Sequence, residues 1–109
     1  DCESCLPARQ AVDRIAACSE QITVEEFNVV LDKTQARTYG IERVPAVALV
    51  GQVDTGIRFY GVPDGYETVS LVQAILLVAS GESGLSDESR SRLAEIQQPV
   101  TIQVFVTPT

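Results

Sequence analysis

Two cysteines separated by two residues, immediately ahead of an amphipathic helix, are the feature that most constrains this chain. They lie in the sequence Cys2-Glu3-Ser4-Cys5. Five apolar residues then recur at helical spacing and predict one buried stripe: Ala8, Ala11, Val12, Ile15 and Cys18. We expect a helix over residues 4–19 with Ser4 as its N-cap, because Pro7 is tolerated only in a first turn. Cys2 then precedes the helix and Cys5 lies in its first turn.

The paired cysteines allow three interpretations. Next to an alternation of strands and helices, such a pair is typical of a thioredoxin-like redox dithiol. A zinc site would need two more ligands, and only Cys18 remains in a chain without histidine. The third interpretation is two incidental cysteines. We expect Cys18 to be a core residue, since it lies about 20 Å along the helix from Cys5 and disulfides need Cα atoms within about 7 Å.

The composition excludes several classes of function. The net charge is −7, from 8 Lys and Arg against 15 Asp and Glu, so an acidic surface repels the phosphates of nucleic acids. The absence of histidine removes Ser-His and Cys-His catalysis. The longest apolar run, 74–79, is too short to cross a membrane, and no basic segment precedes an apolar one as in a signal peptide. We therefore expect a cytoplasmic protein, and a fragment of a longer one because no initiator methionine is present.

The rest of the pattern predicts a series of alternating elements. The apolar and β-branched runs indicate strands at 23–32 (with a core of Phe27–Leu31), Ala46–Val50, 57–60 and 100–107. Helices are expected at 34–39, at 66–80 and from the cap Ser86 to about Gln98, where Pro99 follows. In the helix over 66–80, the residues at core spacing are Val69, Val72, Ile75, Leu76 and Ala79.

Three segments carry a resemblance to a known family. They are Tyr39-Gly40-Ile41-Glu42-Arg43-Val44-Pro45-Ala46, Arg58-Phe59-Tyr60-Gly61-Val62-Pro63-Asp64-Gly65-Tyr66-Glu67 and Gln103-Val104-Phe105-Val106-Thr107-Pro108-Thr109. With the paired cysteines, residues 2–80 resemble the thioredoxin/glutaredoxin superfamily, and in particular the glutaredoxin-like protein disulfide oxidoreductases, which carry two thioredoxin-fold units. The implied fold class is α/β, a three-layer α/β/α arrangement with a mixed central sheet. The implied domains are a thioredoxin-fold unit over 1–82 and the opening of a second unit over 83–109.

The resemblance and the position of the cysteines together predict a mechanism. A helix N-terminus stabilises a thiolate, so we expect Cys2 to attack a disulfide and Cys5 to resolve the mixed disulfide. The resemblance implies that Pro45 is a cis proline facing the cysteines and that the backbone of Val44 pairs with an extended substrate. Glu3 departs from common family motifs, and its charge opposes the Cys2 thiolate. We therefore expect a dithiol that is reducing relative to glutathione.

The implied partners follow from the same resemblance. They are protein disulfide substrates, with glutathione as a candidate co-substrate and a thioredoxin-reductase-like or glutathione reductant. No cofactor or metal is expected. A thioredoxin-type sheet also has a strand ahead of the paired cysteines, and here one residue precedes Cys2. We expect residues 100–106 to fill that place within the chain, or to be exchanged in a strand-swapped homodimer.

Two rival functions stay open at this stage. One is a non-catalytic docking or electron-relay domain, similar to the tandem thioredoxin fold of the flavoprotein subunit of alkyl hydroperoxide reductase, whose first unit lacks its cysteines. The other is a metal or iron–sulfur site made by Cys2 and Cys5 across a dimer.

Overall fold

The structure is a computed structural model in which residues 2–105 are described. Within that range the fold is mixed α/β, with four helices and one two-stranded antiparallel sheet. The elements in chain order are α1 (Cys5–Ala16), α2 (Lys33–Thr38), β1 (Ala46–Val50), β2 (Asp54–Tyr60), α3 (Tyr66–Ser80) and α4 (Asp87–Ala94). The predicted helix over 66–80 and the strand Ala46–Val50 are confirmed at their predicted bounds. The other confirmed elements differ in length by a few residues.

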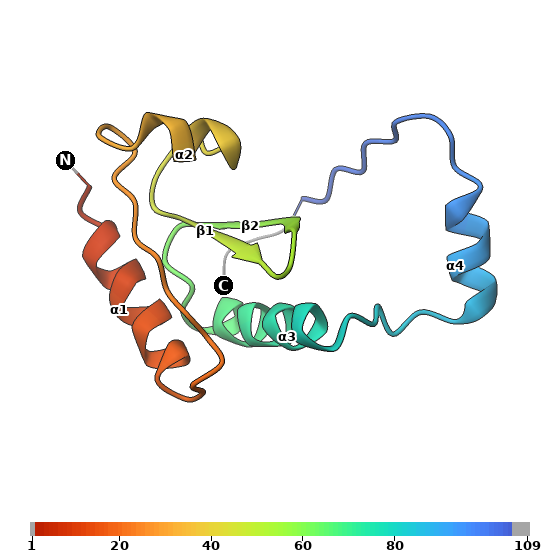
Figure 1. Ribbon diagram of the computed structural model, residues 1–109, viewed down its shortest axis with the longest axis horizontal. Helices are drawn as coiled ribbons and strands as arrows, with labels where there is room; N and C mark the ends of the chain where they lie inside the picture. Colours follow the sequence, from red (N-terminus) through yellow and green to blue (C-terminus); the bar gives the residue numbers. More distant parts are fainter. Residues whose placement is uncertain (1, 106–109) are drawn as a thin grey trace.

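The β1–β2 hairpin is the centre of the fold. Ala46 pairs with Tyr60 and Ala48 with Arg58, and the register shifts between Ala48 and Val50. In Figure 1, α2 and α3 lie on opposite sides of the hairpin. The Arg58 guanidinium donates from Nε to the Tyr39 carbonyl at 2.9 Å, which ties the end of α2 to β2. A Cβ at Gly51 would lie 3.2 Å from Cγ1 of Val78, so α3 runs close beneath the turn.

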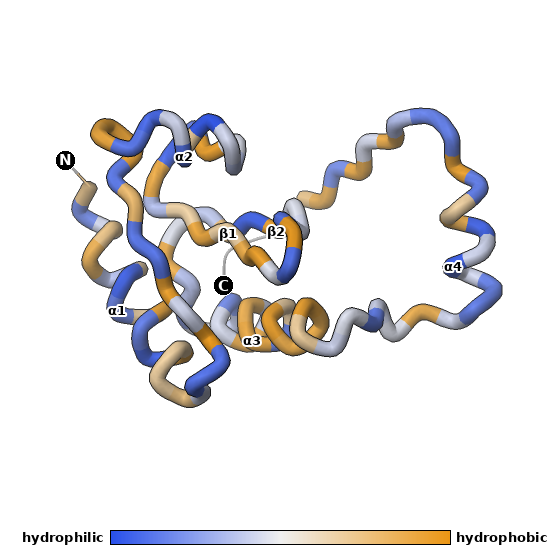
Figure 2. Tube along the Cα trace, viewed as in Figure 1, coloured by the Kyte–Doolittle hydropathy of each residue, from blue (hydrophilic) through white to orange (hydrophobic). Residues whose placement is uncertain are grey.

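The packing face of α3 differs from the sequence prediction. Leu71 is buried at 2% exposure, whereas Val69 is 55% exposed and Leu76 is 62% exposed. Figure 2 shows hydrophobic residues along most of α3. Because this helix is apolar around most of its circumference, periodicity alone could not decide which side faces the hairpin. Of the five residues predicted to face the core, only Ile75 is partly buried, so the predicted face was wrong for Val69, Val72, Leu76 and Ala79.

The prediction for α1 is confirmed in its first turns and wrong at its end. Ala8 and Ala11 are both buried at 4% exposure. The helix ends at Ala16, with Ala17 as its C-cap. Cys18 lies beyond it and is a free, exposed thiol, so it is not the core residue that the stripe predicted. The stripe extended one turn past the actual helix.

The strand predicted at Phe27–Leu31 does not form. The Asn28 side-chain oxygen accepts hydrogen bonds from the amides of Val30 (2.9 Å) and Leu31 (3.1 Å). The Asp32 carboxylate accepts from the Asn28 amide at 2.7 Å. These side chains accept hydrogen bonds from the backbone amides of a turn. In a strand, the same amides would need acceptors on a neighbouring strand. The preceding extended segment runs back along α1 (Figure 1), where Arg9 forms an ion pair with Glu26 at 3.0 Å.

In Figure 1, the C-terminal part runs outward from α3 to α4 and then turns back in the direction of the hairpin. Ser86 caps α4 by accepting from the Ser89 amide at 3.1 Å, as predicted, but the helix ends at Ala94 rather than near Gln98. Residues 100–105 form no strand, and Ile102 is 82% exposed. The expected filling of the sheet by this segment within one chain is therefore wrong for the described residues. Positions 106 and 107 of that predicted strand lie outside them.

No helix among residues 2–105 combines the length and the apolar character needed to cross a bilayer.

A surface ion pair within β2 makes the stability of the hairpin depend on pH. The Arg58 guanidinium contacts the Asp54 carboxylate through two hydrogen bonds of 2.9 and 2.5 Å. The hydrogen bond from Arg58, and then that from the Gly56 amide, holds the pKa of Asp54 below its ordinary value. The ion pair therefore stabilises the fold fully at a pH above the ordinary pKa of an aspartate. The stabilisation is lost as the pH falls through the lower pKa that Asp54 has in the folded protein.

We therefore expect Asp54→Asn to lower the melting temperature slightly at pH 7. The difference from the wild type should shrink as the pH falls below about 4, the ordinary range of an aspartate pKa. Thermal denaturation followed by circular dichroism at several pH values measures this. If the difference in melting temperature between the variant and the wild type stayed constant down to about pH 2, the ion pair would not be its cause.

Candidate functional site

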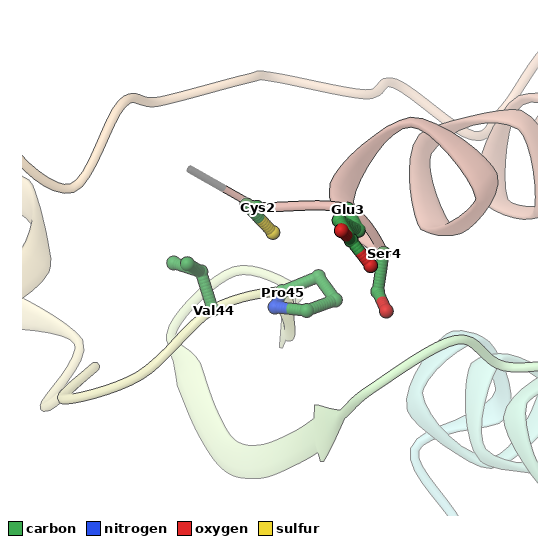
Figure 3. Close-up of a pocket in the computed structure, with 5 residues that line it drawn as sticks. All are labelled: Cys2, Glu3, Ser4, Val44 and Pro45. Atoms are coloured by element: carbon green, nitrogen blue, oxygen red, sulfur yellow. The ribbon is translucent and has the colours of Figure 1, made fainter.

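A surface hollow of about 420 Å³ lies where the start of α1 meets the segment ahead of β1. It is lined by Cys2, Glu3, Ser4, Val44 and Pro45. Figure 3 shows these five side chains, with the Cys2 sulfur directed toward the Val44–Pro45 side. Residues separated by about forty positions in the sequence thus share one hollow.

The start of α1 positions the two cysteines. Cys2 and Cys5 form a disulfide with their Cα atoms 5.4 Å apart. The Cys5 amide points back to the Cys2 carbonyl at 3.4 Å, and the Ala8 amide donates to the Ser4 carbonyl at 3.0 Å. Ser4 is the N-cap, as predicted, but its side chain accepts no capping hydrogen bond. Both cysteines are half-buried, so the disulfide is reachable from solvent.

The hairpin positions the other wall of the hollow. The Val44–Pro45 peptide is cis, as the resemblance implied. The Gly61 amide donates to the Pro45 carbonyl at 3.0 Å, and Gly61 has a φ of 89°, a conformation that glycine adopts readily. Arg43 stacks over the ring of Tyr60 with 4.5 Å between its guanidinium carbon and the ring centroid. Contacts with the end of β2 and the residue after it thus hold the residues on both sides of Val44.

Val44 itself is open to a partner. It is 43% exposed. Among the described residues, no backbone hydrogen bond involves its amide or its carbonyl. An extended chain laid across the hollow could therefore pair with this backbone, as strands do at a free edge.

Glu3 supplies the charge of the hollow. It is the only ionisable side chain among the five lining residues apart from the disulfide-bonded Cys2. The side chain is exposed, and no salt bridge to it is formed within residues 2–105. The sequence prediction treated Glu3 only as a modifier of the Cys2 thiolate. The tertiary structure also places it on the wall that a ligand would contact.

The chemistry available at this hollow is that of sulfur. A thiolate can attack a disulfide sulfur through a mixed-disulfide intermediate, and the reverse step regenerates a dithiol. The described residues contain no group of three or more histidine, cysteine or acidic side chains able to hold a metal ion. The predicted residues Cys2, Val44 and Pro45 all line the hollow, while Cys5 adjoins it through the disulfide. Their individual roles in a reaction stay predictions.

A second hollow of about 240 Å³ lies beside α2. It is lined by Val29, Lys33, Ala36, Arg37 and Ile41. The sequence prediction missed this site, because the turn at Asn28 that brings Val29 to α2 was predicted as a strand. The closeness of Val29 to α2 therefore follows from local side-chain hydrogen bonds rather than from hydrophobic periodicity.

Comparison with known proteins gives one partial relationship. No family model matches the chain. An uncharacterized 9.0 kDa protein in the mobE 3'region of Acidithiobacillus ferrooxidans is 36% identical over 52 residues, which are 48% of this chain and 61% of that protein. The chain therefore matches about three fifths of the length of this curated relative.

Proposed function

We propose that this protein is a thiol–disulfide oxidoreductase with a thioredoxin-like, glutaredoxin-like fold, and that the Cys2–Cys5 pair exchanges electrons with protein disulfides. The observation that carries the proposal is the opening of this disulfide onto the hollow formed by Val44 and Pro45. The order of elements over residues 5–80 supports it, with the paired cysteines at the start of the first helix.

The proposed reaction begins with the reduced protein. The Cys2 thiolate attacks one sulfur of a substrate disulfide, and the first substrate thiolate leaves. The Cys5 thiolate then attacks the Cys2 sulfur, which releases the second substrate thiolate and forms the Cys2–Cys5 disulfide. Two electrons pass to the substrate, and the described disulfide is the oxidised end state. An external two-electron reductant must reduce this disulfide before the next turnover, for example two glutathione molecules that leave as glutathione disulfide.

Each part of the hollow has a place in this scheme. Helix α1 directs its unpaired amides and the positive end of its dipole toward the cysteines, which stabilises a thiolate there. The free backbone of Val44 would hold an extended substrate beside the Cys2 sulfur by main-chain pairing. Positioning of this kind favours attack because the reacting sulfurs are held close together.

The proposed partners are protein disulfides and, as reductant, glutathione or a thioredoxin-reductase-like flavoprotein. The proposed compartment is the cytoplasm, where thiols are kept reduced between turnovers. The segment 100–105 is exposed and has no regular secondary structure, and within residues 2–105 β1 pairs with β2 alone. A strand-swapped homodimer, in which this segment of one copy pairs with β1 of another, is part of the same proposal.

An insulin-reduction assay tests the proposal. With dithiothreitol as the electron donor, the chain should accelerate insulin precipitation well above the rate of dithiothreitol alone, because Cys2 attacks the insulin disulfides directly. Elemental analysis of the same sample distinguishes a metal or iron–sulfur protein. If insulin is reduced no faster than by dithiothreitol alone, the proposed catalytic function is wrong and a docking or electron-relay function is favoured instead.

A further inference from the structure

Glu3 gives the hollow a negative charge at the point where a substrate would flank the attacked sulfur. It lines the hollow together with Cys2, Ser4, Val44 and Pro45, and the other four side chains bring no cation to it. Figure 3 shows Glu3 beside Cys2 on the rim of the hollow. A glutamate carries a negative charge at neutral pH, so a substrate bound in the hollow at Cys2 lies in the field of this charge.

Two arginines on the segments that form the hollow do not line it and make contacts of their own. Arg9, on the first turns of α1, pairs with Glu26 at 3.0 Å and lies 3.7 Å from Asp13. Arg43, next to Val44 in the sequence, stacks over Tyr60 and does not line the hollow. The whole chain carries a net charge of −7, so the surrounding field has the same sign as Glu3.

We propose that Glu3 determines substrate charge: the site accepts disulfides flanked by positive charge, such as basic peptide segments, and disfavours anionic disulfides such as glutathione disulfide. This inference rests on the proposed function. The physical reason is the Coulomb interaction between the Glu3 carboxylate and groups near the attacked sulfur, which is attractive for a cation and repulsive for an anion. Glu3 is a specificity residue here, and the chemical steps belong to Cys2 and Cys5.

Three small disulfides of different charge test the inference. They are cystamine, which carries two ammonium groups, the neutral hydroxyethyl disulfide, and the anionic glutathione disulfide. In a single turnover, the pre-reduced protein gives two electrons and two protons to the small disulfide, forming the Cys2–Cys5 disulfide and two small thiols. The small disulfide is itself the oxidant, and the rate of protein disulfide formation is measured for each.

The variant Glu3→Gln removes the charge and keeps the shape of the side chain. It also changes the reactivity of the Cys2 thiolate, but that change affects all three probes, and the neutral probe measures it. Relative to the neutral probe, we expect the cystamine rate to fall about threefold and the glutathione disulfide rate to rise about threefold, the range of one exposed charge pair. Both changes should diminish at high salt, which screens the interaction.

Glu20→Gln is the matched control. It makes the same change in net charge, but Glu20 follows the far end of α1, outside the hollow. We expect the two rate ratios of this variant to equal those of the wild type. If Glu3→Gln leaves the ratios unchanged, or Glu20→Gln shifts them equally, charge selection by Glu3 is wrong while the proposed function stands. If none of the probes oxidises the dithiol of the wild type, the proposed function itself fails.

Discussion

Replacing Cys2 with serine is expected to lower the rate of insulin reduction by more than about a hundredfold, because a serine hydroxyl cannot replace the attacking thiolate. Cys2 is the cysteine whose sulfur opens onto the hollow beside Val44 and Pro45 (Figure 3). Loss of this thiol removes the first step of exchange, so Cys2→Ser should form no mixed disulfide with a substrate.

Replacing Cys5 with serine should have a different outcome. The first step remains possible, but no thiolate is left to attack Cys2, so the mixed disulfide accumulates. With Cys18 also replaced by serine, so that its exposed thiol cannot react, mass spectrometry under non-reducing conditions would detect one substrate molecule per protein chain. This difference between the two variants assigns attack to Cys2 and resolution to Cys5.

Cys18→Ser is the matched control for both variants. Cys18 is a free, exposed thiol that lies beyond α1 and does not line the hollow. It should retain the wild-type rate of insulin reduction. A hundredfold loss in Cys18→Ser, or full activity in Cys2→Ser, would falsify the assignment of the reaction to the Cys2–Cys5 pair.

Leu71→Ala is expected to have the largest effect on stability. Leu71 is 2% exposed and is one of the largest fully buried side chains within residues 2–105. Its truncation should lower the free energy of unfolding by about 2–5 kcal/mol, the cost of lost burial and a new cavity. In a domain of marginal stability, such a loss is enough to leave much of the protein unfolded. Urea denaturation followed by circular dichroism measures it.

Leu76→Ala on the same helix is the control. Leu76 is 62% exposed, so its truncation removes little buried surface. A change within about 0.5 kcal/mol is expected for such a position. If Leu76→Ala proved as destabilising as Leu71→Ala, the face of α3 that packs toward the hairpin would be the one predicted from the sequence and not the one described.

The sequence predicted the local features of the site correctly. The spacing of the paired cysteines, Pro7 and the following apolar stripe indicated that Cys5 begins a helix, and α1 begins at Cys5. The apolar and β-branched runs at Ala46–Val50 and 57–60 predicted the two strands that form the hairpin. These features depend on hydrogen bonds and steric preferences between residues close in the chain, which are encoded locally.

Three features required the tertiary structure. Periodicity could not show that Leu71 is buried while Leu76 is exposed, since α3 is apolar on both sides. The run Phe27–Leu31 has strand propensity, but the Asn28 and Asp32 side chains accept backbone hydrogen bonds there and form a turn. The meeting of Glu3 with Val44 and Pro45 depends on long-range folding of the chain.

The sequence by itself therefore determined that two cysteines lie at the start of a helix and that a hairpin and a long apolar helix follow. Only the tertiary structure decided that Glu3 shares the hollow with Val44 and Pro45, which side of α3 is buried and which apolar runs become strands. The physical reason is that helix and turn formation depend on neighbours a few residues away. Strand pairing and burial depend instead on which distant segments are present to provide hydrogen bonds and apolar contact.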